Sequence, residues 1–360
     1  MLDTKAVADL LGLTVQHTRW LFRRGIVPAT KLGRDWFTCR EDVAPYVAQR
    51  ELGERRRQLQ LPDDAAAAGA PRKAGVPSQG EAAVSAVNVA QVPQLSPFRY
   101  PGGKTWLIPY IRRWLGQQPS PAIELVDPFA GGGIVSLTAV FEGLVERATL
   151  VELDEDVAAV WLTILNGHGP WLAGCIRKFS PTTDSVGRAL ANGNRSLEHR
   201  AFAGIVKNRV TRGGILAPGA GFVKLGENGK GLASRWYPHT LSRRVLQIVG
   251  RRDRLHFIHG DGMKVLRQYS ARAGVVYFID PPYTVAGRRL YKHCDIDHEA
   301  LFVLASRLKG DFLMTYDNAE EVRTLAGKYR FPTRAIEMKT THHRQKTELL
   351  IGRSLGWLGG

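Results

Sequence analysis

The sequence predicts an α/β protein with a mostly parallel sheet, preceded by a small helix-turn-helix module. From about residue 95, short apolar runs alternate with amphipathic runs, which is typical of a parallel sheet with helices on both faces. Two short amphipathic segments joined by a glycine occur within residues 1–58. Between these regions, residues 59–94 are rich in Ala, Gly, Pro, Ser and Gln, without an aromatic residue, and predict a flexible linker.

Composition limits the classes of protein to consider. The 360 residues suffice for one large and one small domain, and 44% hydrophobic residues excludes general disorder. No apolar run approaches the ~20 residues of a membrane span, and the N-terminus lacks a signal-peptide layout, so we expect a cytoplasmic protein without a membrane partner. Because the three cysteines are far apart, neither a disulfide framework nor a cysteine-rich zinc site is expected.

The formal net charge of +17 is a large excess, and its natural partner is a polyanion. Basic residues are spread along the whole chain, which favours a folded surface that binds double-stranded DNA or RNA. The alternative is a basic protein without a nucleic-acid role.

The first module begins with two predicted helices. Thr4 can cap a helix whose apolar face is Val7, Leu10 and Leu11, and Gly12 ends it. Thr14 can cap a second helix that runs to Gly25. Its inward residues would be Val15, Thr18, Leu21 and Phe22.

The outward face of the second helix carries residue types that contact bases and phosphates. Two short strands around a basic turn at 31–34 predict a wing, and residues 40–50 predict a closing helix. Residues 2–52 thus resemble the excisionase or MerR-like winged helix-turn-helix family, and the alternative is a three-helix interaction module. The predicted DNA contacts of this module are Gln16, Arg19 and Arg23.

The large domain, predicted over 95–355, contains seven apolar segments of strand type. A glycine-rich region at 207–235, between the second and third, fits no strand-helix alternation and predicts an inserted, loop-rich subdomain. The predicted strands are 122–127, 148–153, 254–261, 274–280 and 311–317, followed by a hairpin of 333–338 and 347–352.

Several of these strands end in polar or glycine-rich sequence, where parallel sheets bind ligands. Gly131 to Gly133 let the backbone approach a ligand, although dinucleotide enzymes also have such a turn. Glu152 can accept hydrogen bonds from ribose hydroxyls, and Asp261 can bind an exocyclic amine. Each acid alone could instead be a helix cap or a salt-bridge partner, as is equally expected of Asp154, but together they predict an adenosine-type pocket.

The stretch Asp-Pro-Pro-Tyr at 280–283 predicts the chemistry. The Asp280 carboxylate and the Pro281 carbonyl are two acceptors that the prolines hold still. They can take both hydrogens of a nucleobase amine, direct its lone pair at an electrophile and stabilise the developing positive charge. Tyr283 can stack on the base. The implied methyl donor is S-adenosylmethionine, and no metal is required.

These motifs together resemble the Dam-type, class alpha, DNA adenine-N6 methyltransferases, over about residues 95–353. "FRYPGGK" at 98–104 matches the family's opening cofactor motif through Tyr100 and Lys104, and "DPPY" at 280–283 matches its catalytic tetrad. Glu152 stands where the family usually has aspartate. The resemblance implies a Rossmann-like S-adenosylmethionine-dependent methyltransferase fold with a target-recognition insert. Its implied catalytic residues are Asp280, Pro281, Pro282 and Tyr283; its implied cofactor contacts are Tyr100, Lys104, Asp127, Pro128, Phe129, Gly131, Gly133, Glu152, Asp261 and Asp280.

The resemblance also implies base flipping, and sequence reading by a target-recognition insert over about 176–245. Asn208, Arg209, Arg212 and Arg235 are the predicted DNA contacts there, whether to bases or to phosphates, and Arg288 is predicted to hold the extruded strand. The alternatives are an N4-cytosine methyltransferase and a DNA-binding regulator with an inactive methyltransferase fold. Adjacent His342 and His343 would point to opposite faces of a strand, so no metal site is predicted. Nothing in the sequence identifies a restriction endonuclease partner.

Overall fold

The computed structural model divides into two compact units, Met1–Glu81 and Ala82–Gly360. It describes residues 2–11, 15, 18–19, 22, 27–32, 35–39, 41–43, 92–99, 102–118, 122–191, 196–216, 220–223, 226, 229–282, 296–339 and 345–359. Several residues with predicted roles lie outside this description, as does most of the 59–94 linker, so the structure does not test those predictions. The residues concerned are Gln16, Arg23, Tyr100, Tyr283, Arg288, His342 and His343.

The N-terminal unit contains a three-stranded antiparallel sheet and helix α1. Strand β3 lies between β1 and β2, and its pairing with β2 confirms the predicted pair of short strands. Its small core is formed by Val7, Leu11, Phe22, Val27 and Val43. The elements are β1 (Leu2–Asp3), α1 (Thr4–Leu11), β2 (Thr30–Leu32) and β3 (Asp35–Thr38).

Two details of helix α1 differ from the sequence predictions. The cap of α1 is Asp3, whose Oδ1 accepts a 2.7 Å hydrogen bond from the Ala6 amide, whereas Thr4 is buried inside the helix. Leu10 is 46% exposed because the buried stripe of α1 runs through Val7, Ala8 and Leu11.

The second predicted helix is described only in part, so the helix-turn-helix motif stays a prediction. Thr18 and Phe22 are helical and buried, as predicted, and Arg19 is exposed. Val15, predicted to face inward, is 37% exposed.

The C-terminal unit is built on a seven-stranded sheet with the order β6-β5-β4-β7-β8-β10-β9. Strands β4 to β8 are parallel where they pair, and β10 is antiparallel to both β8 and β9. This order is that of the Rossmann-like fold of S-adenosylmethionine-dependent methyltransferases, so the predicted fold class and terminal hairpin are confirmed. The strands are β4 (Glu124–Asp127), β5 (Arg147–Glu152), β6 (Leu255–His259), β7 (Val275–Ile279), β8 (Phe312–Asp317), β9 (Thr333–Lys339) and β10 (Gln345–Gly352).

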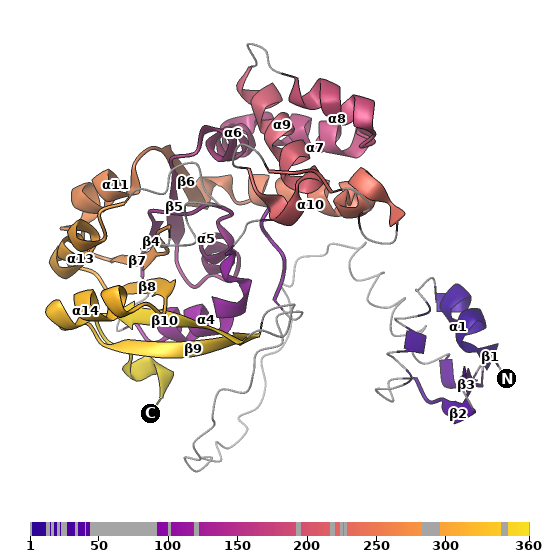
Figure 1. The fold of residues 1–360 in the computed structure, drawn as a ribbon, viewed down its shortest axis with the longest axis horizontal. Coiled ribbons are helices and arrows are strands. Elements are labelled where there is room, and N and C mark those ends of the chain that lie inside the picture. The colour runs from indigo at the N-terminus through magenta and orange to yellow at the C-terminus, as the bar shows by residue number, and fades with distance from the viewer. Residues whose placement is uncertain are drawn as a thin grey trace, which may run out of the picture. The chain divides into compact units, whose positions relative to one another are not determined.

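Helices cover both faces of this sheet (Figure 1). Alternate residues of β7 enter two cores: Val276 and Phe278 pack with α4, α5 and α6, whereas Tyr277 and Ile279 pack with α11, α13 and α14. The helices are α4 (Ile108–Gly116), α5 (Ile134–Phe141), α6 (Glu155–Thr163), α11 (Gly262–Tyr269), α13 (His298–Arg307) and α14 (Glu320–Lys328), with short 3-10 helices at Lys104–Leu107, Arg252–Arg254 and Gly356–Leu358.

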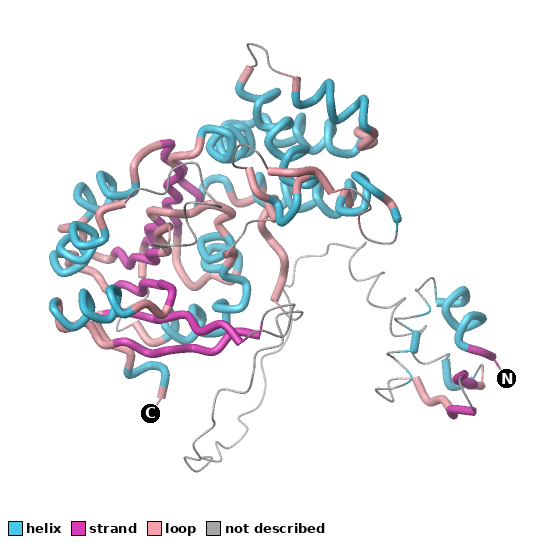
Figure 2. Tube along the Cα trace, in the orientation of Figure 1, coloured by secondary structure: helices cyan, strands magenta, loops and turns pink. Residues whose placement is uncertain are grey.

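Along the chain, a group of helices follows α6 and precedes β6, and this group contains the predicted insert (Figure 2). The chain bends at Ile164–His168, where Asn166 and Gly167 leave helical geometry. Helix α9 packs along α6, and α10 packs along α7. The elements are α7 (Gly169–Lys178), α8 (Thr183–Leu190), α9 (Leu197–Val210) and α10 (Pro238–Val249), with 3-10 helices η4 (Arg212–Gly214) and η6 (Gly231–Arg235).

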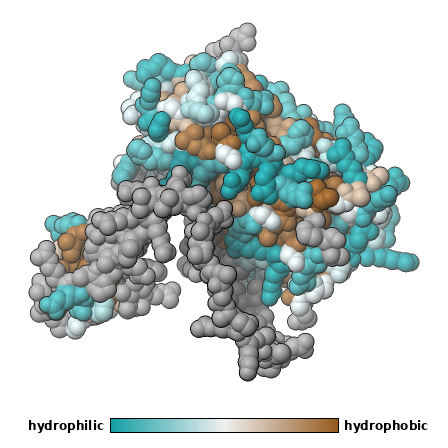
Figure 3. Space-filling view, turned by 180° about the vertical axis from the view of Figure 1, so that it is seen from behind, coloured by the Kyte–Doolittle hydropathy of each residue, from teal (hydrophilic) through white to brown (hydrophobic). Residues whose placement is uncertain are grey.

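Hydrophilic residues cover most of the C-terminal unit's surface in Figure 3, with a few apolar patches between them. Among the residues that the structure describes, no helix is both long enough and apolar enough to cross a membrane.

The strand order reverses between β4 and β7, because the chain proceeds from β4 to β5 and β6 on one side and from β7 to β8 on the other. In open parallel sheets, ligands bind beyond the carboxyl ends of the strands at this point. Asp127 ends β4 and Asp280 follows β7, so both predicted acids lie at the reversal.

Candidate active site

A cavity of about 980 Å³ opens beyond the carboxyl ends of β4, β5, β6 and β7. It brings together residues that lie far apart in the sequence, and its size suits a nucleoside-sized ligand. Ten of the predicted catalytic and cofactor-binding residues line it: Lys104, Asp127, Pro128, Phe129, Gly133, Glu152, Asp261, Asp280, Pro281 and Pro282.

The glycine turn after β4 forms one wall of this cavity. Gly133 has φ +62°, and a Cβ there would lie 2.7 Å from Leu150 Cδ2 and 2.8 Å from Trp161 Cζ2, so a side chain does not fit. The turn is held from both sides. Trp161 Nε1 donates to the Gly131 carbonyl at 3.0 Å, and Ser96 Oγ donates to the Gly132 carbonyl at 2.5 Å.

Glu152 ends β5, and its carboxylate is held in one orientation by backbone amides. Oε2 accepts a hydrogen bond from Gly131 at 3.1 Å, and Oε1 accepts from Leu153 and Asp154 at 2.8 Å. Burial raises the pKa of Glu152 to about 7, although these amides lower it. Asp154 caps α6 by accepting from Asp156 and Val157, which confirms its alternative role.

Asp127, at the end of β4, is only 2% exposed. Its Oδ2 accepts a 2.8 Å hydrogen bond from Ser136 Oγ on α5. The pKa of Asp127 is raised to about 7, mainly by burial and also by the charges of Asp280 and Glu152, against the lowering effect of the Ser136 hydrogen bond. The strand ends therefore form a wall of carboxyl groups.

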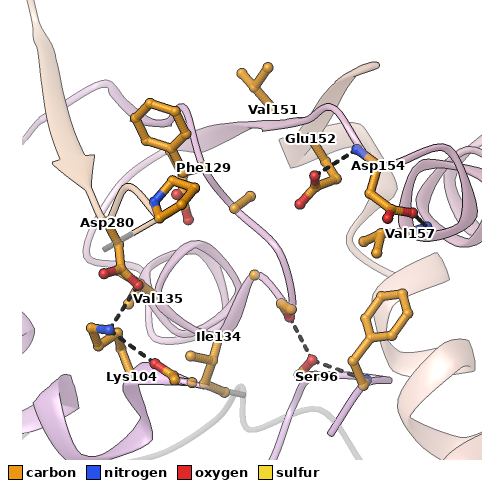
Figure 4. A pocket seen from close by; sticks show the side chains of 18 of the residues that line it. Ser96, Lys104, Phe129, Ile134, Val135, Val151, Glu152, Asp154, Val157 and Asp280 are labelled. Carbon is orange, nitrogen blue, oxygen red and sulfur yellow. Dashed lines mark hydrogen bonds and ion pairs between the residues drawn. The ribbon is translucent and has the colours of Figure 1, made fainter. Parts of the chain in front are cut away.

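Asp280 is held by two partners on the opposite side of the cavity from Glu152 (Figure 4). Lys104 Nζ lies 2.9 Å from Asp280 Oδ2, and Thr315 Oγ1 donates to Asp280 Oδ1 at 2.7 Å. The Asp280 side chain is 21% exposed, so a ligand in the cavity can reach it, whereas Lys104 is 4% exposed. The arrangement presents a fixed carboxylate to the cavity.

Glu348 and Thr315 are functional candidates that the sequence reading missed. Glu348 Oε2 on β10 lies 3.6 Å from Lys104 Nζ, and its side chain is 3% exposed. A carboxylate directly before the apolar run of residues 349–351 was the available signal, since such a residue is rarely buried without a partner.

No protein-family model and no curated protein matches the chain. Among solved structures, the rRNA methyltransferase aviRa from Streptomyces viridochromogenes has a TM-score of 0.36 at 13% identity, covering 75% of this chain and 94% of its own. A putative RNA methyltransferase from Pyrococcus horikoshii has a TM-score of 0.32 at 13% identity, covering 71% and 84%. The B. subtilis m1A22 tRNA methyltransferase TrmK has a TM-score of 0.31 at 11% identity, covering 69% and 73%. Such values bear on neither the substrate nor the reaction.

Asp261 lies at the mouth of the cavity after β6. Its Oδ1 accepts from the Met263 amide at 2.8 Å, so it also caps α11. Gly262 packs against the Pro128 backbone, where a Cβ would lie 2.0 Å from the Pro128 carbonyl oxygen. This close approach joins the ends of β4 and β6 into one wall.

Two residues predicted to contact DNA are buried. Asn208 is 0% exposed: its Oδ1 accepts from the Arg99 amide, and its Nδ2 donates to the Arg99 and Gly214 carbonyls. Asn208 therefore fixes the backbone beside the cavity and does not read bases. Arg209 is 6% exposed and donates to the Pro97 carbonyl at 2.7 Å, but it lines the cavity, so its contact with DNA stays a prediction.

The other two insert residues keep their predicted role as a hypothesis. Arg212 is exposed and Arg235 is partly buried. Nothing in the described residues tests whether either one contacts DNA.

Proposed function

We propose that this protein transfers a methyl group from S-adenosylmethionine to the exocyclic N6 amine of adenine in DNA. The observation that carries the proposal is the fixed carboxylate of Asp280, which shares one cavity with Glu152 and the glycine turn. An acceptor for an amine and a nucleoside-binding wall therefore lie within reach of one bound molecule.

The residues of this chain fit the cofactor. Gly133 and Gly262 both line the cavity, and neither has room for a Cβ, because Leu150 and Trp161 pack against Gly133 and the Pro128 backbone packs against Gly262. Glu152 is oriented by three amides, and it can accept hydrogen bonds from a ribose. The wall of carboxyl groups favours a ligand that carries positive charge. When bound, S-adenosylmethionine would supply an electrophilic methyl group on a positively charged sulfur.

Asp280 would act on the amine of the substrate. Its carboxylate and the Pro281 carbonyl can accept the two amine hydrogens, which directs the nitrogen lone pair away from the ring. Lys104 and Thr315 hold the carboxylate during this step, so little reorganisation is needed. The same acceptors stabilise the positive charge that develops on the nitrogen as it attacks the methyl group.

DNA as the substrate is supported by the net charge of +17 and by the motif order. The base must leave the helix to reach Asp280, because the cavity lies beyond the strand ends and is lined by protein side chains. The predicted helix-turn-helix module would add affinity for DNA.

The test is incubation with labelled S-adenosylmethionine and unmethylated DNA, followed by nucleoside analysis. We expect label in N6-methyladenine from the wild type and none from Asp280→Ala, while Asp280→Ala retains most of its DNA binding. Asp253→Ala is a matched control, since Asp253 is 94% exposed and does not line the cavity. Label in N4-methylcytosine would refute the choice of base, and no label at all would refute the enzyme.

A further inference from the structure

A group of arginines lines the end of the cavity that faces the insert. Arg209 comes from α9, Arg244 from α10, and Arg99 from the segment that leads into the first 3-10 helix. The acids described above lie at the other end, on the strands. The cavity is therefore polarised, with carboxylates at the sheet and guanidinium groups at the insert.

Arg209 is the most unusual member, because it is a charged side chain that is 6% exposed. Its Nη2 donates to the Pro97 carbonyl, while its Nε has no hydrogen-bond partner among the residues that the structure describes. The pKa of Arg209 is lowered to about 9, mainly by burial and also by the charges of Arg244 and Arg99. A buried cation beside two other cations is costly unless an anion joins it.

Arg244 and its surroundings are built to hold such an anion. Arg244 is partly buried, and its Nη1 donates to the Ser96 carbonyl at 3.2 Å. Thr240 lies four residues earlier on α10 and also lines the cavity, so the two share one face of the helix. Asn208 fixes the backbone of Arg99 on the other side.

The charges distinguish between candidate anions. S-adenosylmethionine carries two positive groups and one carboxylate. Its net positive charge therefore suits the end of the cavity that is lined by carboxyl groups. A DNA phosphodiester carries a full negative charge on two oxygens, which matches the fork of a guanidinium group. Several arginines at one place therefore fit a phosphate better than they fit the cofactor.

We propose that Arg99, Arg209 and Arg244 bind a backbone phosphate of the DNA strand next to the base that enters the cavity. This inference rests on the proposed function and names the group by which the substrate strand is held.

The experiment compares Arg244→Gln with Arg323→Gln. Both changes remove one positive charge, but Arg323 lies on α14 and does not line the cavity. Fluorescence anisotropy would measure the affinity for a labelled DNA duplex at several salt concentrations. Calorimetry would measure the affinity for S-adenosylhomocysteine, and thermal unfolding would confirm that each variant folds. Arg209→Lys is a second variant, which keeps the positive charge but lacks the planar guanidinium group that can donate two parallel hydrogen bonds.

We expect Arg244→Gln to weaken DNA binding about five- to tenfold and to reduce the salt slope by about one, while Arg323→Gln has less effect. The affinity for S-adenosylhomocysteine should stay unchanged in both. Equal effects of the two variants on DNA would overturn the proposal, as would a loss confined to S-adenosylhomocysteine. If the wild type transfers no methyl group but the difference in DNA binding is found, the phosphate site stands and the proposed reaction fails.

Discussion

The ammonium group of Lys104 lies 2.9 Å from Oδ2 of Asp280, although the two residues are separated by most of the C-terminal unit in sequence. Lys104 begins the first 3-10 helix and Asp280 follows the central strand β7. Glu348 contacts the same ammonium group from β10. Two carboxylates thus share one buried cation, and the carboxylate that faces the cavity is held in place by charge and by Thr315.

Lys104→Met should remove the shared cation and leave two carboxylates facing each other. We expect the free energy of unfolding to fall by about 3 kcal/mol, as for other broken buried ion pairs. The double variant Lys104→Met with Glu348→Gln should recover most of this stability, because one uncompensated charge is gone. Both variants should lose methyl transfer about 100-fold, the range for removal of one preorganised group. Urea unfolding and the labelling assay measure the two effects.

The Lys104 expectation fails if the double variant is no more stable than the single one. Glu348 would then not belong to the same charge network.

Thr315→Val should separate positioning from folding. Thr315 is fully buried, and valine has nearly its shape, so the change is confined to the lost hydrogen bond and should cost about 1–3 kcal/mol. The loss of the 2.7 Å hydrogen bond to Asp280 should lower kcat about tenfold and leave the KM for S-adenosylmethionine unchanged. Thr315→Ser keeps the hydroxyl and should retain most of the activity. A KM effect without a kcat effect would show that Thr315 does not position Asp280.

Much of the fold could be predicted from the sequence, because each strand is a compact apolar run that ends at a polar residue. The ends of β4, β5 and β7 therefore placed Asp127, Glu152 and Asp280 at one sheet edge. The partners of Asp280 could not be predicted in the same way. Thr315 reaches Asp280 because β8 pairs beside β7, and Glu348 reaches Lys104 because β10 pairs antiparallel beside β8. Pairing register between distant strands is not visible in local sequence.

In the insert, a residue that was predicted to contact DNA is buried. Asn208 looked like a DNA contact because polar residues near glycines are typical of exposed loops. Helix α9 in fact continues to Val210, and its last turn packs under the Arg99 backbone. A backbone carbonyl that needs a buried donor cannot be recognised from composition.

Asn208→Asp should therefore destabilise the protein without a specific effect on base recognition. The new carboxylate oxygen would replace the Nδ2 group that donates to the carbonyls of Arg99 and Gly214, so acceptors would face acceptors. We expect a loss of about 3 kcal/mol in urea unfolding, typical of a buried charge beside unpaired carbonyls. A fully stable variant with altered sequence preference in the methylation assay would restore the original view of Asn208.

Gly133→Ala and Gly143→Ala form a matched pair of changes. Both glycines have positive φ, +62° and +69°, but only the Cβ at 133 would meet side chains, whereas nothing lies within 4 Å at 143. We expect Gly143→Ala to cost about 1 kcal/mol from backbone strain and Gly133→Ala about 3 kcal/mol or more. Gly133→Ala should also weaken binding of S-adenosylhomocysteine in calorimetry. Equal costs would show that Leu150 and Trp161 move aside without loss.

The raised pKa of Asp127 gives stability a definite dependence on pH. Its pKa is about 7 in the folded protein against an ordinary value of 3.8, so between these values the folded state binds the proton more tightly than the unfolded state. This contribution to stability is therefore fully present below about pH 4 and is lost as the pH rises through about 7. Asp127→Asn cannot ionise and keeps a side-chain oxygen that can accept from Ser136. We expect the variant to gain stability relative to the wild type between pH 5.5 and 8, at up to about 1.4 kcal/mol per pH unit. Urea unfolding of both proteins at pH 5.5, 6.5, 7.5 and 8.5 measures the difference. A constant difference across this range would show that Asp127 is already ionised at pH 5.5 and that its burial does not hold the proton.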